Sequence, residues 1–198
     1  LYREFGDKEM LNAINAGKDL HRVTASQIYG ITEEKVTKDQ RQFAKIANFG
    51  YPANMSPATF VEYARGYGVK VSEPEAVELK NLWASTIPSI KQFWNIGRKD
   101  TNILPTGRVR ARCSYTALLN TYFQGLAADG AKLAMYLLWK EGFKIVAFVH
   151  DQVLLEVQED RALELLPKAE ALLIKGMTFV TPDVKITVEG KISNKFTK

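Results

Sequence analysis

A pair of apolar runs that enclose a histidine and an aspartate constrains the fold of this chain more than any other segment. Residues 144–149 and 153–157 are dominated by apolar side chains, and the polar residues His150 and Asp151 lie between them. Two such runs joined by a short polar turn are typical of a β-hairpin. A tight turn between strands holds a side chain more firmly than a loop does. We therefore expect a hairpin that presents Asp151 at a fixed position.

The segments around this hairpin predict an α+β fold. Helices are expected to fill most of the chain before the turn at 104–107, and one buried helix is expected over the apolar segment 117–140. A further helix over 160–175 would cover the back of the sheet, and 184–188 is predicted to form a third strand. This order indicates a helical subdomain, about residues 30–100, inserted into a sheet-based one.

Capping residues and glycines set the expected boundaries of the early helices. Serine, threonine and aspartate favour helix starts, glycine favours helix ends, and the residue before proline avoids helical angles. The expected helices are 1–15, a segment opened by Asp19 or Thr24 and closed by Gly30, a segment opened by Thr37 or Asp39 and closed by Gly50, then 57–65, 73–83 and 88–98.

Composition limits the kind of site that the chain can hold. The single cysteine, Cys113, excludes an intramolecular disulfide and a thiolate zinc cluster, and two histidines are too few for a histidine-rich metal site. Any metal is therefore expected to be bound by carboxylates, which favours magnesium or manganese. The net charge of +5 suits a polyanionic partner, although many basic proteins bind no nucleic acid.

The sequence contains no feature that would direct the chain to a membrane. No signal peptide opens it, and no apolar run reaches the length of a membrane span. The low cysteine content is typical of a reducing compartment. We therefore expect a soluble protein of such a compartment, without a membrane partner.

Arg41, Lys45 and Phe49 lie four residues apart, which places them on one stripe of a helix. One interpretation is a solvated charged face that ends in a core phenylalanine. The other is a phosphate-binding face, on which arginine grips phosphate with its forked guanidinium, lysine supplies a point charge and Phe49 packs against a base. The spacing alone leaves both interpretations open.

Asp151 is the candidate for binding a metal. A carboxylate between the apolar residues Val149 and Val153 would be costly to bury without a partner, and a divalent cation would remove that cost. Two metal ions about 3.5–4 Å apart can stabilise both oxygens of a phosphoryl transfer. Because one carboxylate cannot hold two ions, this hypothesis requires a second carboxylate elsewhere. The alternative is a polar hairpin turn without a function.

Two further groups of polar residues have both a functional and a structural interpretation. Asn120 and Gln124 lie four apart on the apolar helix, where they either make ordinary internal hydrogen bonds or contact base edges in a groove. Arg108, Arg110 and Arg112 alternate, so that all three would line one side of an extended segment. That side either contacts backbone phosphates or is a solvated strand.

Taken together, these residues resemble those of family A DNA polymerases, the type shared by bacterial repair polymerases and many phage replicases. The resemblance covers almost the whole chain, from Gly6-Asp7 to the tail, and its motifs occur in the family's order. The last motif, Glu189-Gly190-Lys191, is most similar to phage members. The other matching segments are Asp19-Leu-His21-x3-Ala25, Arg41-x3-Lys45-x3-Phe49-Gly50, Leu119-Asn120-Thr-Tyr-Phe-Gln124-Gly125-x-Ala-Ala-Asp129 and Val149-His150-Asp151.

The resemblance implies three groups of site residues. The hairpin would hold the catalytic metal, Mg²⁺ or Mn²⁺, on Asp151, with His150 near the primer terminus and also contributing to catalysis. Phosphoryl transfer needs mainly positioning and charge neutralisation, and these residue types supply both. The residues expected to bind the deoxynucleoside triphosphate are His21, Arg41, Lys45 and Phe49, of which Lys45 is also catalytic. The residues expected to bind primer–template DNA are Arg108, Arg110, Asn120, Gln124 and His150.

The resemblance also implies a division into subdomains. Residues 1–29 would connect palm to fingers, 30–103 would form the fingers subdomain, and 104–198 would form the palm subdomain with the catalytic hairpin. The family's other metal-binding aspartate lies in a palm strand upstream of the region that resembles the start of this chain, and the thumb lies further upstream. The expected fold is therefore an incomplete polymerase palm sheet with helical fingers inserted.

Two positions depart from the family pattern. The tyrosine expected in Phe-Gly-x-x-Tyr-Gly is Ala53 here, and Tyr51, two residues earlier, would be turned roughly 200° away on a helix. The glutamate that usually follows the catalytic aspartate is Gln152, which keeps the size but removes the charge. The first change bears on fidelity and template positioning, and the second on metal affinity.

The leading hypothesis is the C-terminal fingers and palm portion of a split or processed template-directed DNA polymerase. It would add deoxynucleotides to a primer 3′ end in the cytoplasm of a bacterial or virus-infected cell, with an upstream partner chain supplying the other catalytic aspartate and the thumb. The alternative is a catalytically impaired DNA-binding protein that retains the polymerase fold. A basic helical interaction module unrelated to polymerases would require all the motif matches to be accidental.

Overall fold

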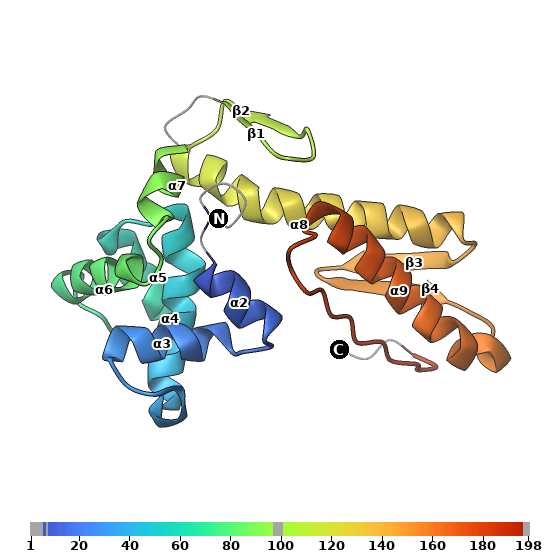
Figure 1. The fold of residues 1–198 in the computed structure, drawn as a ribbon, viewed down its shortest axis with the longest axis horizontal. Helices are drawn as coiled ribbons and strands as arrows, with labels where there is room; N and C mark the ends of the chain where they lie inside the picture. The colour runs from blue at the N-terminus through green and yellow to red at the C-terminus, as the bar shows by residue number, and fades with distance from the viewer. Residues whose placement is uncertain (1–5, 7, 97–100, 196–198) are drawn as a thin grey trace. The chain divides into compact units, whose positions relative to one another are not determined.

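The computed structural model describes residues 6, 8–96 and 101–195, which form two compact units (Figure 1). We call them the N-terminal unit, Leu1–Phe123, and the C-terminal unit, Gln124–Lys198. Within the described residues, the N-terminal unit is helical apart from one small hairpin, and the C-terminal unit combines long helices with a second hairpin. Helices and antiparallel strands in separate segments confirm the α+β class.

The elements follow the order expected from the sequence, except for a short strand, β1, that no pattern indicates, and for the strand expected over 184–188, which is not observed. The helices are α2 (Glu9–Asn15), α3 (Leu20–Tyr29), α4 (Lys38–Gly50), α5 (Pro57–Gly66), α6 (Glu73–Ser85), α7 (Ile90–Ile96), α8 (Tyr115–Lys140) and α9 (Ala162–Val180), with 3-10 turns η1 (Glu33–Lys35), η2 (Tyr51–Ala53) and η3 (Glu159–Arg161). The strands are β1 (Thr101–Ile103), β2 (Val109–Ala111), β3 (Lys144–Val149) and β4 (Gln152–Glu156).

Side-chain caps open the central helices of the N-terminal unit. Asp19 accepts hydrogen bonds from backbone N–H groups in the first turn of α3, and Thr37 opens α4 through a reciprocal capping box with Gln40. Of the alternatives at these two positions, Thr24 lies inside α3 and Asp39 inside α4. Each cap satisfies a backbone N–H that the helix itself leaves unpaired, so these helix starts are fixed by local sequence.

The observed helix ends differ from the expected ones by a few residues. The helix expected at 1–15 is observed over Glu9–Asn15 and the one expected at 88–98 over Ile90–Ile96, although residues 1–5, 7, 97 and 98 lie outside the described part of the chain. α9 continues beyond 175 because its last residue, Val180, is buried and packing stabilises the final turn. None of the described helices combines the length and the apolar character needed to cross a membrane.

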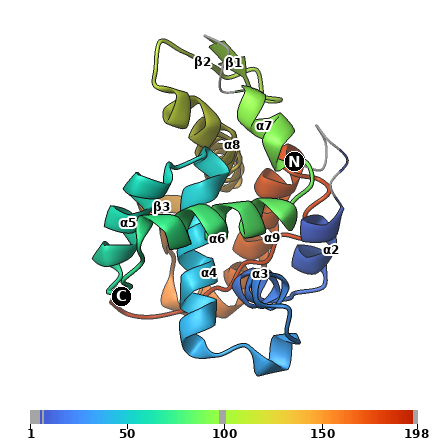
Figure 2. The same cartoon turned by 90° about the vertical axis from the view of Figure 1, so that its left-hand side faces the viewer.

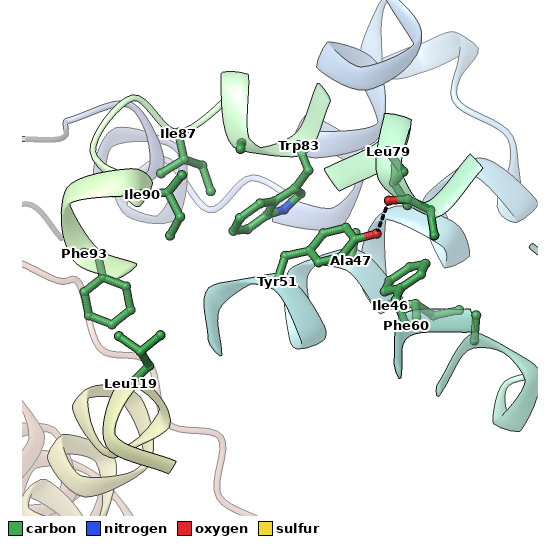
Figure 3. Close-up of a cluster of buried hydrophobic side chains, with 13 residues drawn as sticks. Ile46, Ala47, Tyr51, Phe60, Leu79, Trp83, Ile87, Ile90, Phe93 and Leu119 are labelled. Atoms are coloured by element: carbon green, nitrogen blue, oxygen red, sulfur yellow. Dashed lines mark hydrogen bonds between the residues drawn. The ribbon is translucent and has the colours of Figure 1, made fainter. Parts of the chain in front are cut away.

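An aromatic-rich cluster forms a core in the N-terminal unit (Figure 3). α6 crosses over α4 in Figure 2, so side chains from both helices reach this core. Tyr51 is fully buried in it, with its ring stacked on Phe60 at 4.5 Å between centroids and its hydroxyl donating to the backbone oxygen of Ala76 at 3.0 Å. Tyr51 is therefore a core residue, and its side chain does not take the place of the tyrosine that the family pattern has at position 53.

The hairpin expected in the C-terminal unit is confirmed. β3 and β4 pair antiparallel, and His150 and Asp151 form the loop between the paired residues Val149 and Gln152. The hairpin lies beside α8 and α9 (Figure 1), and one of its faces contributes to an apolar cluster with side chains of both helices. The side chains that form this core are Leu138, Phe143, Ile145, Val153, Leu155, Leu165, Ala169, Leu172 and Leu173.

The third strand predicted over 184–188 is wrong. In the structure this segment follows α9 without pairing to a strand, although three half-buried apolar side chains alternate along it with two exposed polar ones. Alternating burial satisfies the sequence pattern of a strand, but a strand also needs a neighbour for its backbone hydrogen bonds. Among the described residues, each sheet is a single two-stranded hairpin that leaves this segment without one.

Helices α8 and α9 approach each other closely at two glycines. A Cβ atom added to Gly176 of α9 would overlap the backbone of Ala134 in α8, and one added to Gly130 of α8 would meet the sulfur of Met177. Glycine lets the two backbones come into contact at these positions. The distance between α8 and α9, on which the β3–β4 hairpin packs, therefore depends on the absence of a side chain at Gly130 and Gly176.

Replacing Gly176 with alanine is expected to lower the free energy of unfolding by about 1–3 kcal/mol, because the added methyl group forces the two helices apart. Urea denaturation followed by circular dichroism measures the change. Gly66→Ala is the matched control, since a Cβ there would meet no atom within 4 Å. The control is expected to leave the stability unchanged or to raise it by up to about 1 kcal/mol. Equal unfolding midpoints for the two variants would contradict the close approach.

Candidate functional site

Helix α4 presents a basic and aromatic stripe on one side. Arg41 and Lys45 are half-buried and Phe49 is 53% exposed, whereas Ala44 and Ile46 on the other side are fully buried. The spacing of the three stripe residues follows the helical repeat, as the sequence predicts. Because the phenylalanine is not a core residue, the interpretation of a charged face that ends in the core is wrong.

His21 of α3 lies against this stripe. Its ring meets that of Phe49 edge-on, with 5.6 Å between the centroids and 69° between the planes. The Nζ of Lys45 lies 5.8 Å from the centroid of the same phenylalanine ring. The structure thus brings together four residues that the sequence patterns single out. We call this group the α3–α4 cluster: His21, Arg41, Lys45 and Phe49.

Asp19 offsets part of the positive charge of the cluster. Its Oδ2 accepts a hydrogen bond from Nε of Arg41 at 2.6 Å, while its Oδ1 caps α3. Burial favours the neutral carboxyl, but the hydrogen bond and charge of Arg41, together with the backbone N–H donors, hold the pKa of Asp19 below its ordinary value. The pair is about a third exposed, so it orients Arg41 more than it stabilises the fold.

His21 is held as a neutral side chain. Burial lowers the pKa of His21 below its ordinary value of 6.5, and the positive charges of Arg41 and Lys45 add to this effect against the opposing charge of Asp19. A neutral imidazole has one N–H donor and one acceptor nitrogen. The cluster therefore combines two permanent cations with a neutral hydrogen-bonding ring.

The tip of the β3–β4 hairpin presents His150 and Asp151 to solvent. His150 has φ of +56°, in the left-handed region that costs an ordinary residue about 1–2 kcal/mol. Asp151 is exposed because the loop projects beyond the last paired residues, Val149 and Gln152. Among the described residues, Asp151 therefore carries no burial cost that a cation would have to offset.

Asp151 can act as one ligand of a metal but does not form a complete site by itself. Within residues 6, 8–96 and 101–195, no group of three or more histidine, cysteine, aspartate and glutamate side chains is placed to hold a metal ion. An exposed carboxylate is a hard oxygen donor, of the kind that Mg²⁺ and Mn²⁺ take. It fits as one member of a ligand set that other oxygen atoms complete. Gln152, beside it, supplies an amide in place of a second carboxylate.

Asn120 and Gln124 lie on one stripe of α8, and both side chains are exposed. No hydrogen bond joins either amide to another residue in the described part of the chain. Within the described residues, this pair therefore shows none of the internal hydrogen bonds that one of the two interpretations requires. Both side chains are exposed in the part of the chain that the structure describes.

The three alternating arginines are exposed but do not share one strand. Arg110 lies in β2 opposite Asn102 of β1, and Arg108 directly precedes β2. Arg112 follows the strand and has φ of +54°, so the extended backbone ends before it. The predicted alternation therefore applies to Arg108 and Arg110 and is wrong for Arg112.

The structure also places a residue beside the cluster that the sequence patterns do not single out. The Nδ2 of Asn48 lies 3.1 Å from Nδ1 of His21 and 3.1 Å from Oγ1 of Thr24, and its Oδ1 accepts a hydrogen bond from Nε1 of Trp83 at 2.7 Å. The partners of Asn48 lie on α3 and α6, at a distance in the chain that helical spacing cannot report. No local signal in the sequence could have identified it.

Comparison with solved structures shows that the class of fold is that of a polymerase domain. The chain is similar to the POL domain of Pol1 from M. smegmatis, solved in complex with DNA primer-template and dNTP, with a TM-score of 0.74. The similarity covers 92% of this chain and 35% of that chain, at 24% sequence identity. At this identity the likeness concerns the fold alone.

The chain belongs to DNA polymerase family A, whose family model matches residues 4–198. It is 32% identical to DNA polymerase I of Aquifex aeolicus, in an alignment that covers 97% of this chain and 36% of that protein. It is 28% identical to DNA polymerase I of Geobacillus stearothermophilus, in an alignment that covers 89% of this chain and 22% of that protein. These matches confirm the resemblance drawn from the motifs. The chain spans about a third or less of the length of these relatives.

Proposed function

We propose that this chain supplies nucleotide-binding, DNA-binding and metal-ligating residues of a template-directed DNA polymerase, which adds deoxynucleotides to a primer 3′ end. The observation that carries the proposal is the α3–α4 cluster, where two cations, a neutral imidazole and an exposed aromatic ring meet on one surface of a family A chain. Cations and an N–H donor suit a triphosphate, and an exposed ring suits a base.

Each member of the cluster has a distinct task in this proposal. Arg41, oriented by its ion pair with Asp19, grips phosphate oxygens with the rest of its guanidinium. Lys45 supplies a compact charge that also neutralises negative charge developing in the transition state, which makes it a catalytic residue. Phe49, whose ring lies near both the His21 ring and the Lys45 ammonium, stacks near the incoming base.

The tip of the β3–β4 hairpin provides the metal-binding carboxylate in this proposal. Asp151 binds a divalent ion, Mg²⁺ or Mn²⁺, which when bound neutralises phosphate charge and activates the primer 3′ hydroxyl. The paired strands fix the direction of this carboxylate, and His150 contacts DNA near the primer terminus. The left-handed backbone at His150 is the conformation that a two-residue hairpin loop requires, and it keeps this residue at the tip.

The duplex is proposed to contact α8 and the β1–β2 hairpin. Asn120 and Gln124 donate to acceptors in the minor groove, which are similar for all base pairs, so the contacts sense shape without sequence. Arg108 and Arg110 contact backbone phosphates. These contacts would hold the primer–template independently of its sequence, as template-directed synthesis requires.

We further propose that an upstream polypeptide completes the enzyme. Residues 1–29 would connect palm to fingers, 30–103 would be the fingers and 104–198 the palm. Asp151 requires at least one more carboxylate partner for two-metal chemistry. The upstream polypeptide, either a separate chain or part of a longer one, supplies this aspartate and the thumb. The enzyme would act in the cytoplasm of a bacterial or virus-infected cell.

Primer extension with and without the upstream polypeptide tests this proposal. The chain is mixed with a 5′-labelled primer–template, the four deoxynucleoside triphosphates and Mg²⁺, and the products are resolved by length. Extension is expected when the upstream polypeptide is present. Absence of extension from a mixture that folds and binds the primer–template would contradict the proposal.

A second candidate is a DNA-binding protein that retains the fold without catalysis. Ala53 and Gln152, where the family pattern has tyrosine and glutamate, favour it. The two candidates differ in their need for the hairpin carboxylate. If Asp151→Asn leaves the biological function of the gene intact in the host, the binding role is correct and the catalytic one is not.

A further inference from the structure

The orientation of the Asn48 side-chain amide is fixed by Trp83. An indole nitrogen can only donate, so the Asn48 atom 2.7 Å from Nε1 of Trp83 must be the oxygen. Trp83 is fully buried and its ring stacks with that of Trp94, which prevents the indole from turning away. The Nδ2 group of Asn48 is therefore directed toward α3.

The two N–H groups of that amide are matched by two acceptors. Nδ2 lies 3.1 Å from Oγ1 of Thr24 and 3.1 Å from Nδ1 of His21. The Thr24 hydroxyl already donates its own proton to the backbone oxygen of Leu20 at 2.8 Å, so toward Asn48 it accepts. Nδ1 of His21 likewise faces a group that only donates, and it must be unprotonated. A neutral His21 then carries its proton on Nε2.

We propose that Asn48 is a positioning residue, which holds His21 as the Nε2–H tautomer so that this N–H donates to a phosphate oxygen of the incoming nucleotide. This inference rests on the proposed function for its ligand, a deoxynucleoside triphosphate. The chain of contacts runs from the buried core at Trp83 through Asn48 to the exposed side of the α3–α4 cluster. Through these contacts, the buried position of Trp83 on α6 determines which nitrogen of His21 on α3 carries the proton.

The tautomer decides whether His21 attracts or repels a phosphate. With the proton on Nε2, the ring offers a donor beyond its contact with Asn48. With the proton on Nδ1, Nε2 would present a lone pair to the phosphate oxygens and repel them. Protonation of both nitrogens would break the hydrogen bond from Asn48.

The surroundings of His21 oppose that double protonation. The charged groups that act on the ring are Arg41 and Lys45 of α4 and Asp19 at the start of α3. Burial and the two cations lower its pKa, and Asp19, already paired with Arg41, only partly offsets them. His21 is therefore neutral at pH 7, where a single tautomer can be selected.

Imidazole nitrogen NMR tests the proposal without any assay of activity. The chain contains two histidines, so ¹⁵N-histidine labelling gives two ring systems, which His21→Gln assigns. Spectra are recorded at about pH 8, above the ordinary pKa of histidine. The His21 ring is expected to show a protonated Nε2 and an unprotonated Nδ1. A protonated Nδ1 in the unmodified protein would overturn the proposal. This measurement is made on the unmodified protein, so its outcome does not depend on whether the Asn48 variant folds.

Asn48→Asp is the decisive variant. A carboxylate of the same size still accepts from Trp83, but its second oxygen can only accept from His21, so Nδ1 must become protonated. Asn81→Asp, at an exposed position of the same unit on α6, is the matched control and is expected to leave the His21 spectrum unchanged. An unprotonated Nδ1 in a folded Asn48→Asp protein would also overturn the proposal.

Addition of a deoxynucleoside triphosphate separates this inference from the function on which it rests. The Nε2 resonance of His21 is expected to shift in the unmodified protein and to lose most of that shift in Asn48→Asp. If the tautomer is as stated but the triphosphate leaves the resonance unmoved, the nucleotide role of His21 is wrong while its positioning by Asn48 stands. A shift that is equal in both proteins would overturn the link between tautomer and phosphate.

Discussion

Replacing Asp151 with asparagine is expected to slow nucleotide addition by roughly 10³-fold, because a metal-bound site contributes several kcal/mol of charge stabilisation and each 1.36 kcal/mol is tenfold in rate. Asparagine has nearly the same size, and Asp151 is exposed, so the hairpin should fold unchanged. Single-turnover primer extension with the upstream polypeptide present measures the rate. Binding of the primer–template, measured by fluorescence anisotropy, should remain within a few-fold of the original.

The control for this variant is Asp160→Asn. Asp160 is another exposed aspartate of the C-terminal unit, in the turn before α9, and its replacement removes the same charge away from the hairpin tip. The control is expected to keep the original rate. Equal rates for the Asp151 and Asp160 variants would show that the hairpin carboxylate takes no part in the reaction.

Replacing Lys45 with alanine is expected to weaken nucleotide binding by roughly 10- to 100-fold, because a hydrogen bond to a charged group contributes about 1.5–3 kcal/mol. Lys45 is a cleaner position for this test than Arg41, whose guanidinium also holds Asp19 at the start of α3. The dissociation constant is measured for a deoxynucleoside triphosphate bound to the protein on a chain-terminated primer. The effect should shrink as the salt concentration rises, since salt screens the attraction.

Lys91→Ala provides the comparison, as an exposed lysine of α7 in the same unit. It also removes one positive charge and is expected to leave nucleotide affinity unchanged. A nucleoside without phosphates should bind the original protein and the Lys45 variant equally weakly. If Lys45→Ala and Lys91→Ala weaken binding to the same extent, general charge rather than the α3–α4 cluster explains the affinity.

Local chemistry explains which parts of the fold the sequence could predict. The caps at Asp19 and Thr37, and the β3–β4 hairpin, depend on residues within a few positions of one another. The hairpin is found where it was predicted, and each cap is one of the two candidates that the sequence offered at that helix start. The Arg41, Lys45 and Phe49 stripe is likewise a consequence of helical repeat alone.

The features that the sequence could not predict depend on distant partners. The segment 184–188 has the alternating burial of a strand, but no other described segment pairs with it to complete one. The exposure of Asp151 depends on what packs around the hairpin, which its apolar neighbours in sequence do not report. Asn48 acquires its role from residues 27 and 35 positions away in the chain, so no spacing rule could identify it.

Single-nucleotide insertion measures whether the chain takes part in template-directed addition of a nucleotide, the activity on which every proposed residue role rests. The chain and the upstream polypeptide are offered a primed template with a known next base, Mg²⁺ and each of the four deoxynucleoside triphosphates in turn. We expect the primer to grow by one nucleotide mainly with the complementary triphosphate. Growth that ignores the template base, or a folded and DNA-bound protein that adds no nucleotide, would contradict this expectation.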